Sequence, residues 1–431
     1  MTTADPGRVT IGAVLRRNRE FRALAIANTL SLAGDDLARV ALAIVFFQRT
    51  HSPFIATFTF ALSFLPGLFG GPLLATLGDR FPRRHVMVVC DVARTCLVGF
   101  GAVGLAADWS AAVPLGALLV AAFFAPPFEA SRAALMPEVV RGADYVAAST
   151  ATAIASQMSQ IVSYVVGAAA VATVGGDGAL LIDAWTFAIS AIVLMWFVRT
   201  GAPADRDDPA VHRGMVAMMM SGARDILSRP ALRSLLTVGS VTLAATAVAE
   251  GLAVVYAAQH GLSGTGQGLI VAAIPIGATL GGFVLTRLVV PLRQPSLIRP
   301  LAVGVCLPLI ATALPVGPPV VFALWVLVGL LLCFQYVANA AFVLHTPDHL
   351  RARAMGLAQG LITFVQAAAM LLGGAAATRI DVRYVVAGGG LLALVVMARP
   401  LLRWPVGISV VHDDDGPPAT AADALPATGL L

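Results

Sequence analysis

Long apolar runs separated by short polar segments dominate the chain. An α-helix needs about 20 apolar residues to cross the roughly 30 Å hydrocarbon core of a bilayer, and twelve runs come close to that length or exceed it. The ninth run is the least regular, because it is short and carries Arg299 near its start. The pattern predicts an all-α integral membrane protein with twelve spans: Phe21–Phe47, Phe54–Leu77, Val86–Ala106, Ala111–Phe128, Tyr145–Val174, Ala179–Val198, Leu232–Ala258, Gly266–Val290, Leu297–Leu314, Val320–Leu344, Ala354–Ala377 and Val382–Leu402.

The longest polar interruption, Arg199–Pro230, divides the twelve runs into six and six. Shifting the first half by 211 residues brings similar residues into register at several places, Arg22 onto Arg233 and Ser52 onto Ser263 among them. Chance agreement in a chain rich in Ala, Gly and Leu is the alternative to a duplication. The register favours two pseudo-symmetric six-helix halves related by an axis along the membrane normal, which is a known repeat arrangement.

These boundaries predict four parts of the chain. Residues 1–198 form the first six-helix half, 199–230 a linker, 231–403 the second half and 404–431 a tail. The tail contains Asp413-Asp414-Asp415 and Gly416-Pro417-Pro418 but little apolar mass. We therefore expect it to be disordered.

The distribution of arginine predicts the orientation in the membrane. Cytoplasmic loops carry an excess of basic residues, and with the N-terminus inside, 23 arginines fall on the cytoplasmic side. Arg49, Arg379 and Arg383 fall outside, while Arg39 and Arg94 lie within helices. Both termini are expected in the cytoplasm, with the chain in the plasma membrane. The use of arginine without lysine and the abundance of Ala, Val and Gly indicate a bacterium with a GC-rich genome.

Composition excludes several classes of protein. Hydrophobic residues make up 58% of the 431 residues and charged residues 12%, whereas soluble domains carry roughly 25% charged residues. All 28 basic residues are arginine, so the chain has no lysine for a phosphate-binding loop or a Schiff base. Arginine at the ends of apolar runs explains the net charge of +5 without a nucleic-acid partner.

No enzyme site or cofactor site stands out. The four cysteines lie within apolar runs without a C-x-x-C pair, and the seven histidines are scattered over loops and helix ends. We expect no cofactor, no metal and no catalytic residues. A membrane-embedded enzyme and a receptor without transport activity remain the alternatives from other classes, although the longest predicted polar connection is Arg199–Pro230.

The polar segment between the second and third runs carries a family resemblance. Ala75–Arg84 resembles the loop signature of the major facilitator superfamily, Gly-x-Leu-Ala-Asp-Arg-x-Gly-Arg-Arg, with Ala75 and Pro82 in place of its glycines. The proline and the segments Ala125–Ala130 and Leu135–Glu138 are similar to the branch that exports drugs, macrolides and siderophores. The matching positions are Leu77, Asp79, Arg80, Arg83 and Arg84.

The resemblance implies a secondary transporter that works by alternating access. It implies proton-driven export of a small amphipathic organic compound, with the lipid bilayer, protons and the substrate as partners, and a monomer. One departure favours an importer or an uncoupled facilitator instead. Drug antiporters of this family usually carry Gly-Pro-x-x-Gly-Gly in helix 5, and the nearest segment here, Ser163–Ala168, keeps one glycine.

Charges inside two predicted helices are candidates for proton coupling. A charge at membrane depth is costly, so it faces a partner or a wet cavity. Asp35 and Arg39 are spaced i,i+4 and can pair, which leaves Asp36 as the carboxylate that could take up and release a proton; a static, fully paired network is the alternative. Glu250 is related to Arg39 by the 211-residue shift. The superfamily places their two helices around the central cavity, so we predict an Arg39–Glu250 contact across it.

Two further sets of residues complete the candidate site. Carboxylate and guanidinium groups form strong bidentate bonds, which predicts a gate on the cytoplasmic side that joins the halves in one state; plain membrane anchoring is the alternative. The gate residues are Asp79, Arg80, Arg83, Arg84, Asp91 and Arg94. Polar residues at helical spacing could face a substrate or bond neighbouring helices: Gln157, Gln160, Gln335, Asn339, Gln359 and Gln366.

Overall fold

A computed structural model describes residues 11–66, 81–140, 142–199, 228–288 and 296–404. In the described part of the chain the regular secondary structure is helical. The helices that precede residue 200 are α1 (Ile11–Arg17), α2 (Arg19–Thr50), α3 (Pro53–Leu62), α7 (Arg83–Ala106), α8 (Ala112–Ala122), α9 (Ala125–Val139) and α10 (Ala143–Phe197). Those that follow are α12 (Pro230–Gln259), α13 (Thr265–Leu288), α14 (Ile298–Ala311), α15 (Pro318–Leu331), α16 (Phe334–Leu344), α17 (Asp348–Ala377) and α18 (Val382–Leu402).

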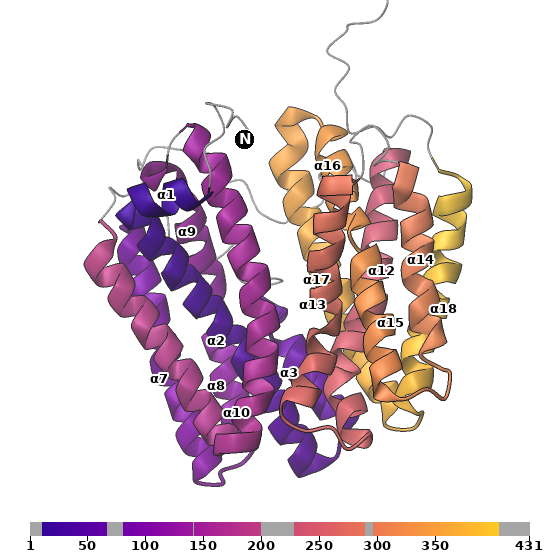
Figure 1. Ribbon diagram of the computed structural model, residues 1–431, viewed down its shortest axis with the longest axis horizontal. Coiled ribbons are helices and arrows are strands. Elements are labelled where there is room, and N and C mark those ends of the chain that lie inside the picture. Colours follow the sequence, from indigo (N-terminus) through magenta and orange to yellow (C-terminus); the bar gives the residue numbers. More distant parts are fainter. Residues whose placement is uncertain (1–10, 67–80, 141, 200–227, 289–295, 405–431) are drawn as a thin grey trace, which may run out of the picture.

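The helices form two bundles that lie side by side (Figure 1). The first bundle contains α1 to α10 and the second contains α12 to α18. We call the end of the molecule on which α1 lies the arm side. The other end, where α2 turns into α3, is the far side. The bundles are separated at the arm side and meet toward the far side (Figure 1).

The predicted twelve spans are confirmed, with differences in how they are divided. The fourth and tenth spans are each broken in the middle, α8 from α9 at Phe123 and Phe124, and α15 from α16 at Leu332 and Cys333. The two breaks lie 209 residues apart, close to the shift found in the sequence. The two halves therefore share this helix break at equivalent positions, as an internal duplication predicts.

The fifth and sixth spans join in α10 through a turn at Gly175. Its φ of 79° is accessible to glycine at little cost, and both ends of α10 lie on the arm side. Near its start, Asn18 donates to the carbonyl of Val139 (2.8 Å), and near its end Arg84 donates to the carbonyl of Val198 (3.0 Å). Residues 67–77 of the predicted second span lie outside the described residues.

Local signals in the sequence explain several helix starts. The Asn18 side chain accepts a hydrogen bond from the backbone N–H of Phe21 (2.9 Å), which caps α2. Pro53, Pro230 and Pro318 occupy the first turns of α3, α12 and α15. Proline lacks a backbone donor and is preset for this position.

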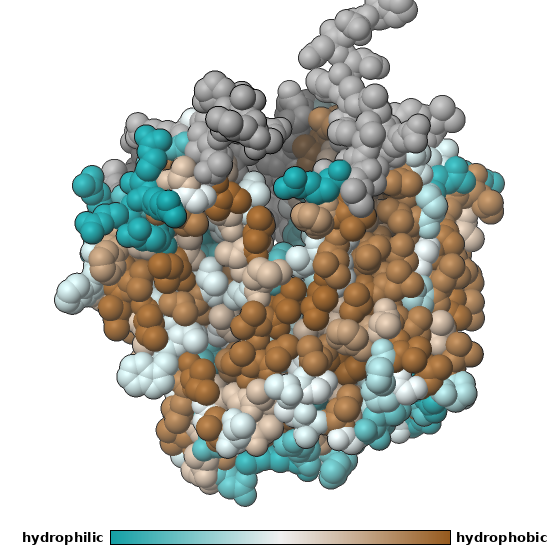
Figure 2. All heavy atoms as spheres, in the orientation of Figure 1, coloured by the Kyte–Doolittle hydropathy of each residue, from teal (hydrophilic) through white to brown (hydrophobic). Residues whose placement is uncertain are grey.

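A broad belt of hydrophobic residues separates two hydrophilic ends (Figure 2). Eight described segments are long and apolar enough to cross a membrane, and α3 and α14 are shorter apolar helices. Large apolar side chains that are more than half exposed are found in both bundles, as expected where the solvent is lipid. They include Val89, Phe100, Trp196, Phe283, Leu372 and Val395.

Close contacts join the two bundles toward the far side. A Cβ atom built at Gly268 of α13 would lie 2.6 Å from the Cα of Val165 in α10. A Cβ atom at Gly374 of α17 would overlap the side chain of Thr57 in α3. Glycine lets these helix backbones approach closely. The structure is therefore closed toward the far side, and the bundles are separated at the arm side.

Candidate functional site

Arg39 in α2 is the centre of a polar site that faces the second bundle. Its guanidinium pairs with the carboxylate of Asp36 (3.0 Å) and donates to the hydroxyl oxygen of Ser63 (2.9 Å). A longer bond of 3.5 Å reaches the hydroxyl of Tyr164 in α10, which also accepts from the amide of Gln160 (3.1 Å). Charged and neutral partners from three segments thus hold Arg39 in one orientation.

The expected pairing of Asp35 with Arg39 is wrong. Arg39 pairs with Asp36, three residues away, and Asp35 pairs with Arg94 of α7 (3.4 Å). Positions i+3 and i+4 both lie on the same helix face, so the neighbouring helices decide between them. Asp36 is therefore the partnered carboxylate of the site, and its side chain is 12% exposed.

Glu250 in α12 approaches the Arg39 site from the second bundle. The two charges interact electrostatically, and Glu250 also acts on Asp36 and Tyr164. Arg39 forms its ion pair with Asp36, and the predicted contact between Arg39 and Glu250 across the central cavity stays a prediction. Among the described residues, Glu250 makes no hydrogen bond or ion pair of its own.

Asp35 and Arg39 also line a small cavity in the first bundle. It has a volume of about 60 Å³, and its walls come from α2, α8 and α9 and from the end of α3. A cavity of this size and polarity can hold water. The site thus has room for a proton carrier next to two of its charged groups.

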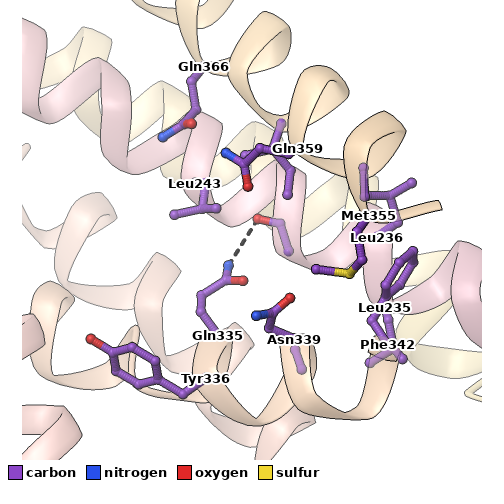
Figure 3. A pocket seen from close by; sticks show the side chains of 14 residues that line it. Leu235, Leu236, Leu243, Gln335, Tyr336, Asn339, Phe342, Met355, Gln359 and Gln366 are labelled. Carbon is purple, nitrogen blue, oxygen red and sulfur yellow. Dashed lines mark hydrogen bonds between the residues drawn. The ribbon is translucent and has the colours of Figure 1, made fainter. Parts of the chain in front are cut away.

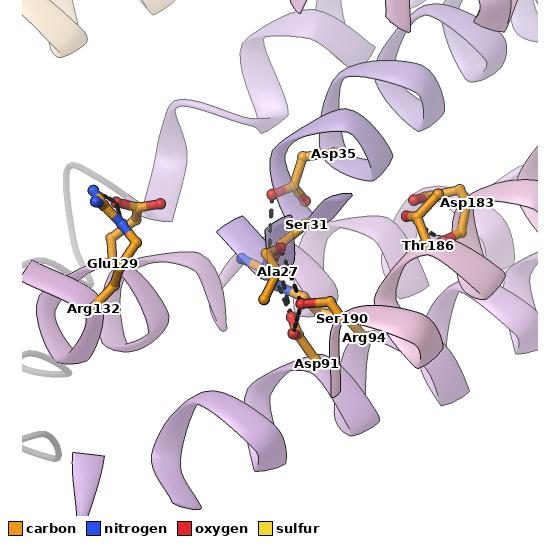
Figure 4. A network of polar contacts seen from close by, with 10 residues as sticks. All are labelled: Ala27, Ser31, Asp35, Asp91, Arg94, Glu129, Arg132, Asp183, Thr186 and Ser190. Atoms are coloured by element: carbon orange, nitrogen blue, oxygen red, sulfur yellow. Dashed lines mark hydrogen bonds and ion pairs between the residues drawn. The ribbon is translucent and has the colours of Figure 1, made fainter. Parts of the chain in front are cut away.

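Arg94 forms a second, fully buried network behind Asp35 (Figure 4). It donates to the hydroxyl oxygen of Ser31 (2.8 Å) and lies 4.0 Å from the carboxylate of Asp91. Asp91 accepts from Ser31 (3.3 Å) and from Ser190 (2.6 Å). These contacts tie α2, α7 and the second half of α10 together.

Aromatic rings and one more acid complete the surroundings of Arg94. Its guanidinium lies 5.1 Å from the ring centre of Phe187 and 5.7 Å from that of Phe128, distances typical of cation–π contacts. Asp183 is fully buried nearby, and neither carboxyl oxygen has a hydrogen-bond partner among the described residues. Its side chain packs against Gly34 of α2, where a Cβ atom would overlap it.

The sequence reasoning missed Ser31, Ser190, Asp183 and Tyr164 as members of these networks. Asp183 could have been found, since it is an acid within a predicted span. Serine and tyrosine occur in helices for many reasons, so their residue types alone carried no such signal.

The described arginines of the predicted gate bond within their own bundle. Arg83 forms an ion pair with Glu138 and donates to the carbonyl of Ala134 (2.8 Å), both in α9, while Arg84 bonds the end of α10. Asp79 and Arg80 lie outside the described residues. Asp91 and Arg94, predicted to extend this gate, instead join Asp35. The role of the loop in joining the two halves stays a prediction.

A larger cavity in the second bundle contains four of the predicted polar residues (Figure 3). Its volume is about 350 Å³, and it lies between α12, α16 and α17 toward the arm side. Gln335 donates to the carbonyl of Gly239 (3.0 Å) and to the hydroxyl oxygen of Thr242 (2.9 Å). The remaining walls are largely apolar. The four polar residues are Gln335, Asn339, Gln359 and Gln366.

The position of this cavity relates it to the charged site. Leu243 lines the cavity, and Glu250 follows seven residues later on the same helix, about 10 Å farther toward the far side. A compound in the cavity would therefore have Glu250 beyond it. The other predicted residues, Gln157 and Gln160, lie in α10 of the first bundle, and Gln160 bonds Tyr164 of the Arg39 site.

Sequence comparisons find transporters with a similar chain. The Multidrug efflux pump Tap of Mycobacterium tuberculosis is 28% identical over 365 residues, which cover 81% of this chain and 84% of that protein. The Enterobactin exporter EntS of Escherichia coli (strain HS) is 26% identical over an alignment 439 residues long, gaps included. The alignment covers 96% of this chain and 98% of that protein.

Solved structures share the fold. A POT family transporter in complex with a thioalcohol conjugated peptide superposes with a TM-score of 0.71 at 11% identity, covering 89% of this chain and 96% of that one. The nucleoside transporter NupG gives a TM-score of 0.66 at 14% identity, covering 89% of this chain and all of that one.

The family model that matches supports the same conclusion. It is described as the Major Facilitator Superfamily and matches residues 24–359, well over half of the chain. This is a family of membrane transporters, not of enzymes, and its members carry small-molecule substrates. Its twelve-span, two-bundle fold is the one observed here. The chain belongs to the Major Facilitator Superfamily.

Proposed function

We propose that this protein exports a small amphipathic organic compound in exchange for protons. The observation that carries the proposal is the Asp36–Arg39 pair of the first bundle, with Glu250 of the second bundle acting on both residues. Charges within membrane spans are costly, which favours a functional role. The relatives Tap and EntS, an efflux pump and an exporter by name, support export over import.

In this mechanism the arm side is the cytoplasmic side. The arginines of the described far-side segments are Arg49, Arg379 and Arg383, and the remaining helix-end arginines lie at the arm side. This bias agrees with the positive-inside rule. The bundles are separated at the arm side, so the cavity lined by Gln335 and Asn339 takes its ligand from the cytoplasm.

Proton exchange would occur at Asp36, with Glu250 as the second partner of Arg39. A proton that arrives from the far side neutralises Asp36, which weakens its pairing with Arg39. Arg39 is then free to turn toward Glu250, and this new contact favours a different arrangement of the two bundles. Loss of the proton to the cytoplasm restores the Asp36–Arg39 pair. Each cycle thus moves one proton inward and returns the Asp36–Arg39 site to its starting state.

Flux in inverted membrane vesicles tests the proposal, with ethidium as the probe. Wild-type protein should accumulate ethidium when a pH gradient is imposed, and Asp36→Asn and Glu250→Gln should each lose that response. Asp108→Asn is the matched control, because Asp108 is an exposed far-side acid that pairs with Arg49 (2.9 Å). The control should behave as wild type.

Other outcomes would contradict parts of the proposal. Gradient-dependent flux that survives in Asp36→Asn and Glu250→Gln would remove these residues from coupling. Flux that ignores the gradient in every variant would instead support an uncoupled facilitator. One observation favours that second candidate: of the helix 5 element found in drug antiporters, the chain keeps only Gly167, which packs against the backbone of Leu37.

A further inference from the structure

A basic cavity lies on the arm side of the second bundle, separate from the sites described above. It has a volume of about 320 Å³ and lies between the first two turns of α12 and the last turn of α18. Arg233 and Ser234 line it from α12, and Arg399 and Arg403 line it from the end of α18. We call it the arginine cavity.

The charge of the arginine cavity is uncompensated within the part of the chain that the structure describes. No aspartate or glutamate lines it, and none of Arg233, Arg399 and Arg403 forms an ion pair with a described residue. The N-terminus of α12, a helix of 30 residues, adds the positive end of a helix dipole. Three guanidinium groups beside such a terminus favour an anion with several oxygen acceptors.

The depth of the arginine cavity in the membrane indicates which part of the bilayer lies beside it. Leu402 lies between the arginines in sequence and is 83% exposed, as expected for a side chain in contact with lipid tails. Trp404 follows Arg403 and packs partly against the core of the second bundle, and tryptophan is typical of the headgroup level of a membrane. The arginine cavity therefore lies at the edge of the apolar belt, where phospholipid headgroups are found.

We propose that the arginine cavity binds the phosphate headgroup of an anionic phospholipid from the leaflet on the arm side. Basic pockets between membrane helices are a known way of recognising such headgroups. The cavity volume is in the range of small-molecule sites, and its neighbour Leu402 would contact the acyl chains. The bound lipid joins the ends of α12 and α18, so it steadies the helix that carries Glu250.

Native mass spectrometry of the full chain tests the proposal, with phosphatidylglycerol and phosphatidylcholine as paired probes. Wild-type protein should retain phosphatidylglycerol in preference to phosphatidylcholine. The triple variant Arg233→Gln, Arg399→Gln and Arg403→Gln should weaken phosphatidylglycerol binding by about tenfold or more. A control variant with Arg16, Arg17 and Arg22 changed to Gln removes three exposed arm-side charges from the first bundle and should bind as wild type.

Three outcomes would overturn the proposal. Wild-type protein could show no preference between the two lipids, or the triple variant could keep its preference. Inorganic phosphate could displace phosphatidylglycerol at millimolar concentration, which would indicate a site for a soluble anion. Size-exclusion chromatography in detergent micelles checks that both triple variants are folded, so that a loss of binding reports on the cavity.

Discussion

Single residues in this protein act through partners that come from other helices. Arg94 is 1% exposed, and its contacts with Asp35, Asp91 and Ser31 join two helices. Removing one partner of a buried ion pair leaves an uncompensated charge, which costs more than the pair itself contributes. The first bundle is therefore expected to be sensitive to the loss of any single charge of the Arg94 network.

We predict that Arg94→Met destabilises the protein by about 3–5 kcal/mol. The double variant Arg94→Met/Asp91→Leu should be less destabilised than the sum of the single changes, because it removes Arg94 together with the more deeply buried of its two carboxylate partners. Thermal unfolding in detergent gives the comparison. Arg132→Met serves as the control, since its partner Glu129 is 39% exposed and the change should cost no more than about 1 kcal/mol. Additive effects of Arg94→Met and Asp91→Leu would contradict the prediction.

The residue types of the site could be predicted from the sequence, but their pairing could not. Asp35, Asp36, Arg39 and Glu250 stand out because charges are rare in membrane spans. Their partners depend on how α7 and α10 pack against α2, and the sequence of α2 contains nothing about that packing. This is why Asp36 was expected to be the unpaired acid, whereas it pairs with Arg39.

At the scale of helices, glycine determines how closely the two bundles approach. Gly268 and Gly374 lie where α13 meets α10 and where α17 meets α3. In a chain with 41 glycines, the sequence does not show which of them lie at contacts between the bundles. Helix positions follow from apolar length, which the sequence displays, but contacts between helices depend on tertiary packing. The spans were thus predictable, and these contacts were not.

Replacing Gly374 with leucine should separate the bundles at the far side. The new side chain would overlap Thr57, and its Cβ atom would lie 3.2 Å from the Cα of Phe54. Spin labels attached at Ser52→Cys and Thr378→Cys report the distance across this contact by electron paramagnetic resonance. We expect a longer mean distance in Gly374→Leu than in the protein with Gly374. Gly356→Leu in the same helix is the control, because a Cβ atom there meets nothing within 4 Å. An unchanged distance in Gly374→Leu would show that this contact does not hold the far side closed.

At the scale of the whole molecule, two properties of the sequence predict most of the architecture. Apolar runs of membrane length set the spans, and the internal repeat sets two bundles of six. The equivalent breaks in the fourth and tenth spans follow the same repeat. The conformational state has no signature in the sequence, because one chain must adopt more than one arrangement to transport a substrate.

Membrane orientation gives a prediction for the intact protein. In a variant without native cysteines, Asp108→Cys at the far side should react with a membrane-impermeant maleimide in whole cells. Arg16→Cys at the arm side should react only after the membrane is permeabilised. Both positions are exposed, so accessibility within the protein does not limit the reaction. The opposite labelling pattern would show that the protein has the reverse orientation in the membrane.

The separation of the bundles at the arm side has a kinetic consequence. In the proposed mechanism the ligand reaches the cavity from this side, so its association needs no prior conformational step and can approach the rate set by diffusion. The slow step of a transport cycle then falls on the far side, where the tight glycine contacts must come apart. Half-saturating ligand concentrations would report mainly the affinity of the cavity, and maximal rates would report how readily those contacts separate.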